Sequence, residues 1–227
     1  MSMMHLRNCK SMGNEMNKPL LSRTAGKIRG FSLVELMIVL VISLVVAAFA
    51  MPSIAGAITT MRLRSAMSSI AGILQETRIM AVKSNKFDVA RNTTYVGANL
   101  FYTDLNFNNA YTPAAGIIAA EPNVQVVAGV TYQTTPPTAF PYATLIGPTL
   151  LTSPTVFNVG FNARGLPCTP TGGSPVTGTP ASCFTDGTVG YLMYFKIAGS
   201  FGDNWSAISV TPAGRIRTWI LNGTHWN

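Results

Sequence analysis

Histidine and cysteine are scarce in this chain of 227 residues, which has two histidines, His5 and His225, and three cysteines. Together with carboxylates, these side chains supply most metal ligands and most acid–base catalysts. The sequence also shows no nucleophile paired with a base and no glycine-rich loop that would hold a phosphate. These absences predict a protein that is not an enzyme and that has neither a cofactor nor a metal site.

Acidic residues are few as well: eight Asp and Glu oppose sixteen Lys and Arg, which gives a net charge of +8. Residues 1–30 hold six of the basic residues and one Glu, a net charge of +5, so only +3 remains for the rest of the chain. Because the basic segment precedes a long apolar run, membrane topology explains most of the surplus. The basicity alone is therefore no evidence for binding to nucleic acid.

The apolar run from Phe31 to Met51 is interrupted only by Ser32, Glu35 and Ser43. As a helix, it is long enough to cross a hydrocarbon core of about 30 Å. The positive-inside rule then leaves residues 1–30 in the cytoplasm and places everything after the run on the other side of the membrane. An ionised Glu35 within the span is costly unless a positive group pairs with it.

Two simpler interpretations remain open at this point. A plain transmembrane anchor explains the apolar run but not the carboxylate within it. A conventional signal peptide, cleaved after Ala48-Phe49-Ala50, would require an unusually long apolar region that also contains an acid.

The residues Gly30 to Leu40, G-F-S-L-V-E-L-M-I-V-L, resemble the processing motif of type IV prepilins and type II secretion pseudopilins. The resemblance implies cleavage after Gly30 by a prepilin peptidase and methylation of Phe31. It also implies that Glu35 pairs with the N-terminal amine of a neighbouring pilin or pseudopilin during filament assembly. The protein would then reside in the bacterial inner membrane as a single-pass protein with a periplasmic head, before it enters a pilus or pseudopilus.

Beyond Pro52, helical periodicity continues to about Lys83. We expect the packed face of this part to contain Ile54, Ile58, Met61, Ile70, Leu74, Thr77 and Ala81. Polar residues occupy the other faces, and two separate helices with a break near Gly56 remain an alternative. The predicted division is a cleaved leader (1–30), a transmembrane and assembly helix (31–53), its amphipathic continuation (54–83) and a β-rich head (84–227).

The head is predicted to be a small antiparallel sheet packed on the helix, an α+β fold of the pilin type. The candidate strands are Tyr95–Tyr102, Val124–Tyr132, Thr155–Phe161, Tyr191–Ile197, Ser206–Val210 and Arg215–Leu221. Asn106–Ala110, Thr134–Pro141 and the uncharged stretch Pro167–Ser182 are expected to be surface loops. Cys168 and Cys183 are expected to form a disulfide, with two free thiols as the alternative.

Near the C-terminus, Thr211-Pro212-Ala213-Gly214 has the composition of a β-turn and predicts a hairpin. Strand alternation would place Ile216, Thr218 and Ile220 on one face, and Arg215, Arg217 and Trp219 on the other. Two guanidinium groups beside an indole could bind a phosphodiester backbone and stack on an exposed base. The simpler interpretation is a solvated strand whose arginines protect a sheet edge and whose tryptophan packs on a neighbour.

The long helix, the β-rich head and the terminal G-R-I-R resemble the FimT/GspH group of minor pilins and pseudopilins. In the FimT branch, this motif is associated with DNA binding for natural transformation, which implicates Gly214, Arg215 and Arg217 (with weaker help from Arg164 or Lys196). The stretch A-N-L-F-Y-T-D-L-N-F-N-N departs from the group because it contains no tryptophan. The prediction is a minor pilin that binds extracellular DNA without sequence preference. The alternatives are a structural or priming minor pilin and a type II secretion pseudopilin that contacts other pseudopilins or secreted proteins.

Overall fold

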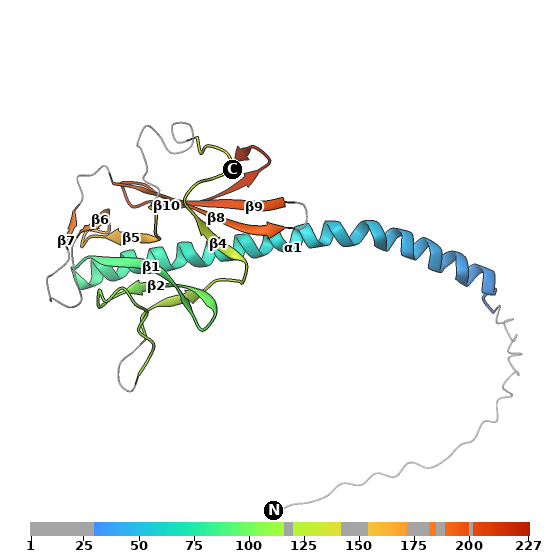
Figure 1. Ribbon diagram of the computed structural model, residues 1–227, viewed down its shortest axis with the longest axis horizontal. Coiled ribbons are helices and arrows are strands. Elements are labelled where there is room, and N and C mark those ends of the chain that lie inside the picture. The colour runs from blue at the N-terminus through green and yellow to red at the C-terminus, as the bar shows by residue number, and fades with distance from the viewer. Residues whose placement is uncertain (1–29, 116–119, 142–153, 172–181, 185–188, 200–201) are drawn as a thin grey trace, which may run out of the picture. The chain divides into compact units, whose positions relative to one another are not determined.

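The structure is a computed structural model, and it describes residues 30–115, 120–141, 154–171, 182–184, 189–199 and 202–227 (Figure 1). The chain forms two units, Met1–Val45 and Val46–Asn227, and each is described separately below. One helix, α1 (Leu33–Ser84), contributes residues to both units. The structure therefore contains a single helix in place of the two that the sequence left open.

The first unit consists, in its described part, of the beginning of α1. The helix starts after Ser32, whose carbonyl accepts the backbone N–H of Leu36 at 3.1 Å. Glu35 lies in the first turn, where a carboxylate interacts favourably with the helix dipole. Apolar side chains from Leu33 to Val45 are exposed. The helix α1 as a whole is long and apolar enough, by length and composition, to cross a membrane. That surface is suited to membrane anchoring.

The second unit packs the rest of α1 against two antiparallel sheets. The first sheet has the order β3 (Asn123–Gln125), β2 (Ala98–Asp104), β1 (Asp88–Tyr95), β5 (Asn158–Phe161), β6 (Pro167–Thr171) and β7 (Ser182–Phe184). The second sheet has the order β11 (His225–Trp226), β10 (Ile216–Asn222), β9 (Gly202–Val210), β8 (Tyr191–Gly199) and β4 (Val130–Gln133). Figure 1 shows β8, β9 and β10 along one side of this part of the helix and β1 and β2 along another. The predicted α+β class is confirmed.

The main core lies between the helix and both sheets. From α1 it takes a stripe of side chains at helical spacing: Leu63, Ala66, Met67, Ile70, Ile73, Leu74 and Ala81. Phe101, Phe157 and Phe195 meet this stripe from the sheets and contact one another edge to face or tilted. Thr77 is buried in the same stripe, and its hydroxyl lies 2.8 Å from that of Thr103. A second, smaller cluster on the outer face of the β8–β9–β10 sheet contains Phe140, Trp219 and Trp226.

The predicted packed face of the helix is correct only in its second half. Ile54, Ile58 and Met61 are exposed. The head first contacts α1 at Thr59, which accepts a hydrogen bond from Asn204, and fully buried side chains begin only at Leu63. The buried stripe is therefore displaced toward the C-terminal half of the helix. There α1 ends in a Schellman motif, with Asn85 in the left-handed conformation and the N–H of Lys86 donated to the carbonyl of Ala81.

Two of the predicted strands are wrong because each contains a turn. Tyr95–Tyr102 is interrupted by Val96 and Gly97, which both have positive φ and connect β1 to β2. Val124–Tyr132 is split into β3 and β4, which lie in different sheets, and Gly129 with φ 94° precedes β4. The other four predicted strands are present with shifted ends.

The stretch Pro167–Ser182 is only partly a loop. Its first residues form β6, where Cys168 is fully buried and pairs opposite Gly160, so the expectation of a surface loop is wrong for Pro167–Thr171. Residues 172–181 lie outside the described residues. The Cys168–Cys183 disulfide is present and joins β6 to β7, with 5.3 Å between the Cα atoms. The disulfide therefore ties together the two short strands at this edge of the sheet.

Candidate functional site

The N-terminal segment presents its implied processing residues on an accessible surface. Gly30 and Phe31 precede the helix, and the side chain of Phe31 is 77% exposed. No heavy atom lies within 4 Å of the position that a Cβ on Gly30 would occupy. Glu35 is exposed one turn into α1. Gly30, Phe31 and Glu35 thus all lie on the exposed surface of the described chain.

The C-terminal hairpin forms as predicted, and its turn is held by three hydrogen bonds. The N–H of Gly214 donates to the carbonyl of Thr211 at 2.7 Å, and the N–H of Thr211 donates to the carbonyl of Arg215 at 2.9 Å. The Thr211 hydroxyl also accepts the N–H of Arg215 at 3.1 Å. Gly214 adopts φ 76°, a conformation that favours glycine. The turn therefore fixes the backbone immediately before the two arginines.

Gly214 is also the point where the hairpin docks on the rest of the head. Its carbonyl accepts a hydrogen bond from Nη1 of Arg78 in α1 at 2.9 Å. A Cβ at Gly214 would approach the carbonyl oxygen of Gly165, in the turn between β5 and β6, to 2.7 Å. Gly165 in turn packs against the Arg78 side chain. Three segments far apart in sequence thus meet at one arginine, and only a glycine fits at position 214.

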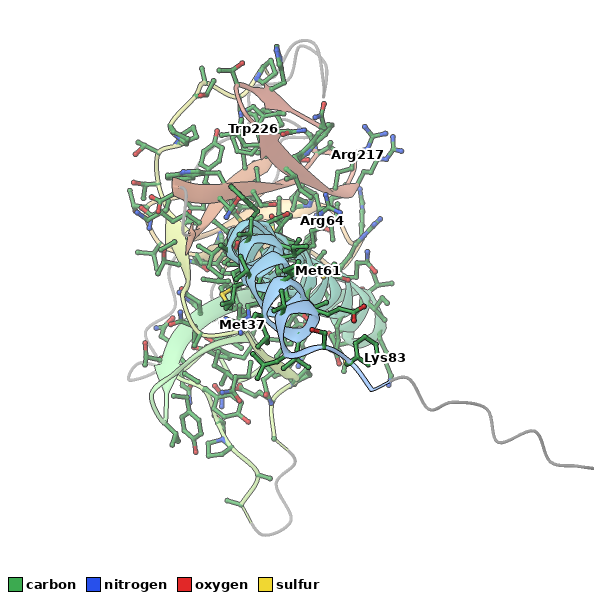
Figure 2. The ribbon with its side chains drawn as sticks, turned by 90° about the vertical axis from the view of Figure 1, so that its right-hand side faces the viewer. Met37, Met61, Arg64, Lys83, Arg217 and Trp226 are labelled. Atoms are coloured by element: carbon green, nitrogen blue, oxygen red, sulfur yellow. A yellow bond between two sulfur atoms is a disulfide. The ribbon has the colours of Figure 1, made fainter. Side chains whose placement is uncertain are left out.

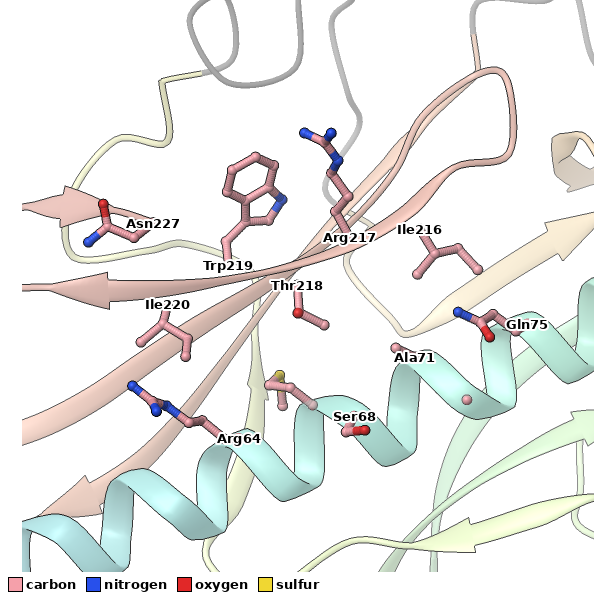
Figure 3. A pocket seen from close by; sticks show the side chains of 12 residues that line it. Arg64, Ser68, Ala71, Gln75, Ile216, Arg217, Thr218, Trp219, Ile220 and Asn227 are labelled. Carbon is pink, nitrogen blue, oxygen red and sulfur yellow. The ribbon is translucent and has the colours of Figure 1, made fainter.

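The two candidate phosphate-binding arginines lie just beyond this junction. Arg215 is exposed immediately before β10. Arg217 is half-buried and lies on the face of β10 that points away from α1 (Figure 3). Ile216, Thr218 and Ile220 point toward the helix, so the predicted alternation of the strand is confirmed. Among the described residues, neither arginine forms an ion pair. Their guanidinium groups are thus free of carboxylate partners within the described part of the chain.

The expectation for Trp219 as a stacking platform requires correction. Its side chain is only 8% exposed, and its indole N–H donates to the Ser209 hydroxyl at 2.8 Å. The ring packs edge to face on Phe140 at 5.5 Å between centroids, and both residues belong to the smaller buried cluster with Trp226. The Arg217 guanidinium lies 5.8 Å from the centre of the same ring. Trp219 therefore supports Arg217 and does not present a free face to a base.

The two secondary candidates differ in their surroundings. Lys196 is paired with Asp203 at 3.2 Å and lies 5.8 Å from the ring centre of Trp205. Arg164 is exposed and precedes Gly165, the residue that packs beside Gly214. Arg164 therefore belongs with the hairpin arginines, whereas the charge of Lys196 is already balanced.

Two acidic residues of the head, Asp104 and Glu121, form contacts inside the head. The Asp104 carboxylate accepts a hydrogen bond from Nε of Arg91 at 2.7 Å. The Glu121 carboxylate accepts hydrogen bonds from the backbone N–H groups of Leu105 and Thr112. Burial raises the pKa of Glu121 above its ordinary value. In the described ranges, no three His, Cys, Asp or Glu side chains are grouped so that they could hold a metal ion. These carboxylates secure the loop after β2 and leave the hairpin surface positive.

Sequence reasoning missed Arg78 and Ser209, which position the hairpin and the indole. Arg78 looks like any polar residue on an amphipathic helix, and its partner is 136 residues away. No local pattern in the sequence indicates either contact.

Comparison with known proteins gives one family and two solved structures. The family described as the prokaryotic N-terminal methylation motif matches residues 26–51. The comparison with curated proteins gave no match. Two crystal structures of the type IV minor pilin FimU of Pseudomonas aeruginosa, in space groups P65 and P21, are 15% identical with TM-scores of 0.35. They cover 72% and 73% of this chain, and the matches span 96% and 92% of the FimU chains.

The methylation motif at residues 26–51, together with a long apolar helix packed on antiparallel sheets, supports a type IV pilin-like protein. The motif implies processing by a prepilin peptidase and assembly with other pilins.

Proposed function

We propose that the protein is a minor type IV pilin whose head binds extracellular DNA at the C-terminal hairpin and thereby serves natural transformation. The chain is cut between Gly30 and Phe31, and it enters the filament through its N-terminal helix and Glu35. The head carries the hairpin outward on the periplasmic side and then outside the cell. DNA is held through its phosphates, without sequence preference.

The observation that carries this proposal is the presentation of Arg215 and Arg217 by a rigid support. Arg78 and Gly165 hold Gly214 in place, Trp219 supports the Arg217 side chain, and no carboxylate in the described residues neutralises either arginine. Arginine binds phosphate through two parallel donors, so a fixed pair is suited to a phosphodiester backbone. Figure 2 shows Arg217 at the periphery of the head, reaching away from the sheets.

The direct test is DNA binding by the full chain in detergent across a salt series. The protein should bind duplex DNA with a log–log salt slope of about −2, because about two phosphates are neutralised. The variant Arg215→Gln/Arg217→Gln should lose most of this affinity. The control Arg62→Gln/Lys83→Gln removes the same charge from exposed positions of α1 and should bind like the unmodified protein. Equal binding by both double variants would overturn the arginine site.

A cellular test distinguishes this function from a structural one. Cells with the arginine variant should assemble normal filaments but take up less DNA than cells with the control variant. If piliation falls instead and uptake per filament is unchanged, the protein is a structural or priming subunit. If secretion of exoproteins falls, the pseudopilin alternative is correct.

A further inference from the structure

An open groove of about 920 Å³ runs between α1 and β10, and Trp219 is among the residues that line it (Figure 3). On the α1 side, the groove is lined by the small residues Ser68, Ala71 and Gly72, whose side chains leave space between the helix and β10. Ile216, Thr218 and Ile220 project into it from β10. A Cβ on Gly72 would have no heavy atom within 4 Å, so the groove is unfilled at this point among the described residues.

The groove lies beside an open edge of β10. At one end of this edge, Ile220 and Asn227 exchange both backbone hydrogen bonds, at 2.9 and 3.0 Å. In an antiparallel strand these bonds alternate, so the backbone groups of Thr218 and Ile216 point to the same edge as those of Ile220. No described strand pairs there, since β11 meets β10 only at Leu221 and Asn222. Within the described ranges, the edge therefore offers two N–H groups and two carbonyl groups without backbone partners.

The charge around the groove has one sign. Arg64 from α1 and Arg217 from β10 both line it, and none of its lining residues is Asp or Glu. Figure 2 shows both arginines on the same side of the head. The other polar lining residues, including Ser68, Gln75 and Asn227, can donate hydrogen bonds. An occupant that carries carboxylates would complement this lining.

The pattern of backbone groups separates a peptide from a nucleic acid. A phosphodiester backbone only accepts hydrogen bonds, so it would leave the carbonyl groups of Ile216 and Thr218 without partners. An extended peptide offers donors and acceptors in the same alternation and satisfies both kinds of group. Exposed edges of this kind are usually shielded, because they pair readily with another chain.

We propose that this groove binds an extended, acidic segment of a partner protein, which adds a strand to the five-stranded sheet beyond Asn227. The segment runs antiparallel to β10 and exchanges backbone hydrogen bonds with Thr218 and Ile216. Its side chains that face α1 lie over Ala71 and Gly72, where small or β-branched residues fit. Those on the other face lie beside Arg217, where Asp or Glu pairs with the guanidinium. This site shares Arg217 with the proposed DNA-binding pair, but it is built on the backbone groups of Thr218 and Ile216, which phosphate binding by the arginines does not use.

The experiment extends the full chain after Asn227 by the sequence Thr-Val-Glu-Val-Glu, so that the added residues continue the β11 edge. The register places the first Glu opposite Arg217 and both Val side chains toward α1. Hydrogen exchange of the Thr218 and Ile216 amides should slow by about tenfold or more, because both amides become paired. A Gly-Gly-Ser-Gly-Ser extension should leave the exchange rates of both amides unchanged.

A charge control and a blocking variant test the two parts of the proposal. The extension Thr-Val-Lys-Val-Lys should protect the amides less than the acidic one, and equal protection would overturn the acidic partner. Gly72→Leu should abolish protection by filling the groove. Gly56→Leu is the matched control, since a Cβ at Gly56 also meets no heavy atom within 4 Å and Gly56 does not line the groove. Unchanged exchange with the acidic extension would overturn the docking site.

The free acidic peptide and a DNA oligonucleotide complete the test on the unextended chain. The peptide should slow exchange at Thr218 and Ile216, whereas the oligonucleotide should leave both amides unchanged. Protection of these amides by the oligonucleotide but not by the peptide would assign the groove to nucleic acid and overturn the proposal. Failure of DNA to bind at Arg215 would overturn only the proposed function, because the peptide measurement reports on different atoms.

Discussion

Arg78 in the middle of the head helix donates a hydrogen bond to the carbonyl of Gly214, the residue that precedes the arginine pair. This contact links α1 directly to the hairpin that presents Arg215 and Arg217. The same side chain packs against Gly165, so it also anchors the turn that carries Arg164. The positions of Arg164, Arg215 and Arg217 thus depend on Arg78, a half-buried arginine that is itself directed inward.

Replacing Arg78 by Met should loosen the hairpin while keeping most of the apolar contacts of the side chain. A hydrogen bond from a charged donor contributes about 1.5–3 kcal/mol, and we expect a loss of stability near the lower end because Arg78 is only half-buried. Chemical denaturation measures this loss, and hydrogen exchange should quicken at Gly214. Arg62→Met, at an exposed position of the same helix, should change the stability by less than about 0.5 kcal/mol. Equal stability of the two variants would show that the Arg78 contact contributes nothing.

Gly214→Ala tests whether the glycine of the G-R-I-R segment is needed for docking. An alanine there must adopt a positive φ and would approach the Gly165 carbonyl oxygen to 2.7 Å. Backbone strain and overpacking together should cost about 2–4 kcal/mol, which thermal unfolding can measure.

Gly223→Ala is the matched control for that variant. Gly223 has a similar φ of 63°, but a Cβ there would meet no heavy atom within 4 Å. This variant should therefore lose only about 1 kcal/mol of stability, because the sole penalty is the positive φ that alanine must adopt. If the two alanine variants are equally stable, the close approach to Gly165 is unimportant.

The turns show how far the sequence determines this fold. Thr211–Gly214 is predictable because proline and glycine stand where a β-turn requires them. The turn at Val96 and Gly97 is not, because valine is β-branched and favours a strand, yet here it has φ 49°. Pairing of β1 with β2 overrides the local preference, and that pairing is not visible in the sequence.

The candidate site follows the same division between local and long-range information. Alternation along β10 predicts which side chains share a face with Arg217, since the period of a strand is fixed. It cannot predict that Phe140 covers Trp219, because this contact depends on a distant segment. The role expected of the indole was therefore wrong, although its face was correct. The start of the buried helical stripe at Leu63 likewise depends on where the head begins to cover α1.

Removal of the disulfide by Cys168→Ser/Cys183→Ser should destabilise the head by about 3 kcal/mol, because the bond closes a loop with a sequence separation of 15. Part of the loss in stability comes from packing, since Cys168 in β6 is fully buried opposite Gly160 of β5 and serine replaces its sulfur with a hydroxyl group. Denaturant unfolding of the oxidised protein, of the reduced protein and of the double serine variant measures the effect. Reduction alone should give most of the loss. A reduced protein as stable as the oxidised one would show that packing alone holds the edge formed by β5, β6 and β7.

Asp88, at the beginning of β1, should make the stability of the head depend on pH. The residue is 4% exposed, and its Oδ2 atom has no hydrogen-bond partner among the described residues. Burial raises its pKa from 3.8 to about 6, so the folded state retains a proton that the unfolded chain releases. The stabilisation from the neutral form is complete below pH 3.8 and is lost as the pH rises to about 6.

Asp88→Asn mimics the neutral carboxyl group and should remove this dependence. At pH 7 the variant should be more stable than the unmodified protein by about 1–3 kcal/mol, with the lower value if water reaches the carboxylate. At pH 4 the two proteins should be nearly equal. Urea denaturation between pH 4 and pH 7 measures both, and the matched variant Asp203→Asn, at an exposed residue, should follow the unmodified protein closely. If Asp88→Asn is less stable than the unmodified protein at pH 7, then Asp88 is bound there as a carboxylate and its charge stabilises the start of β1.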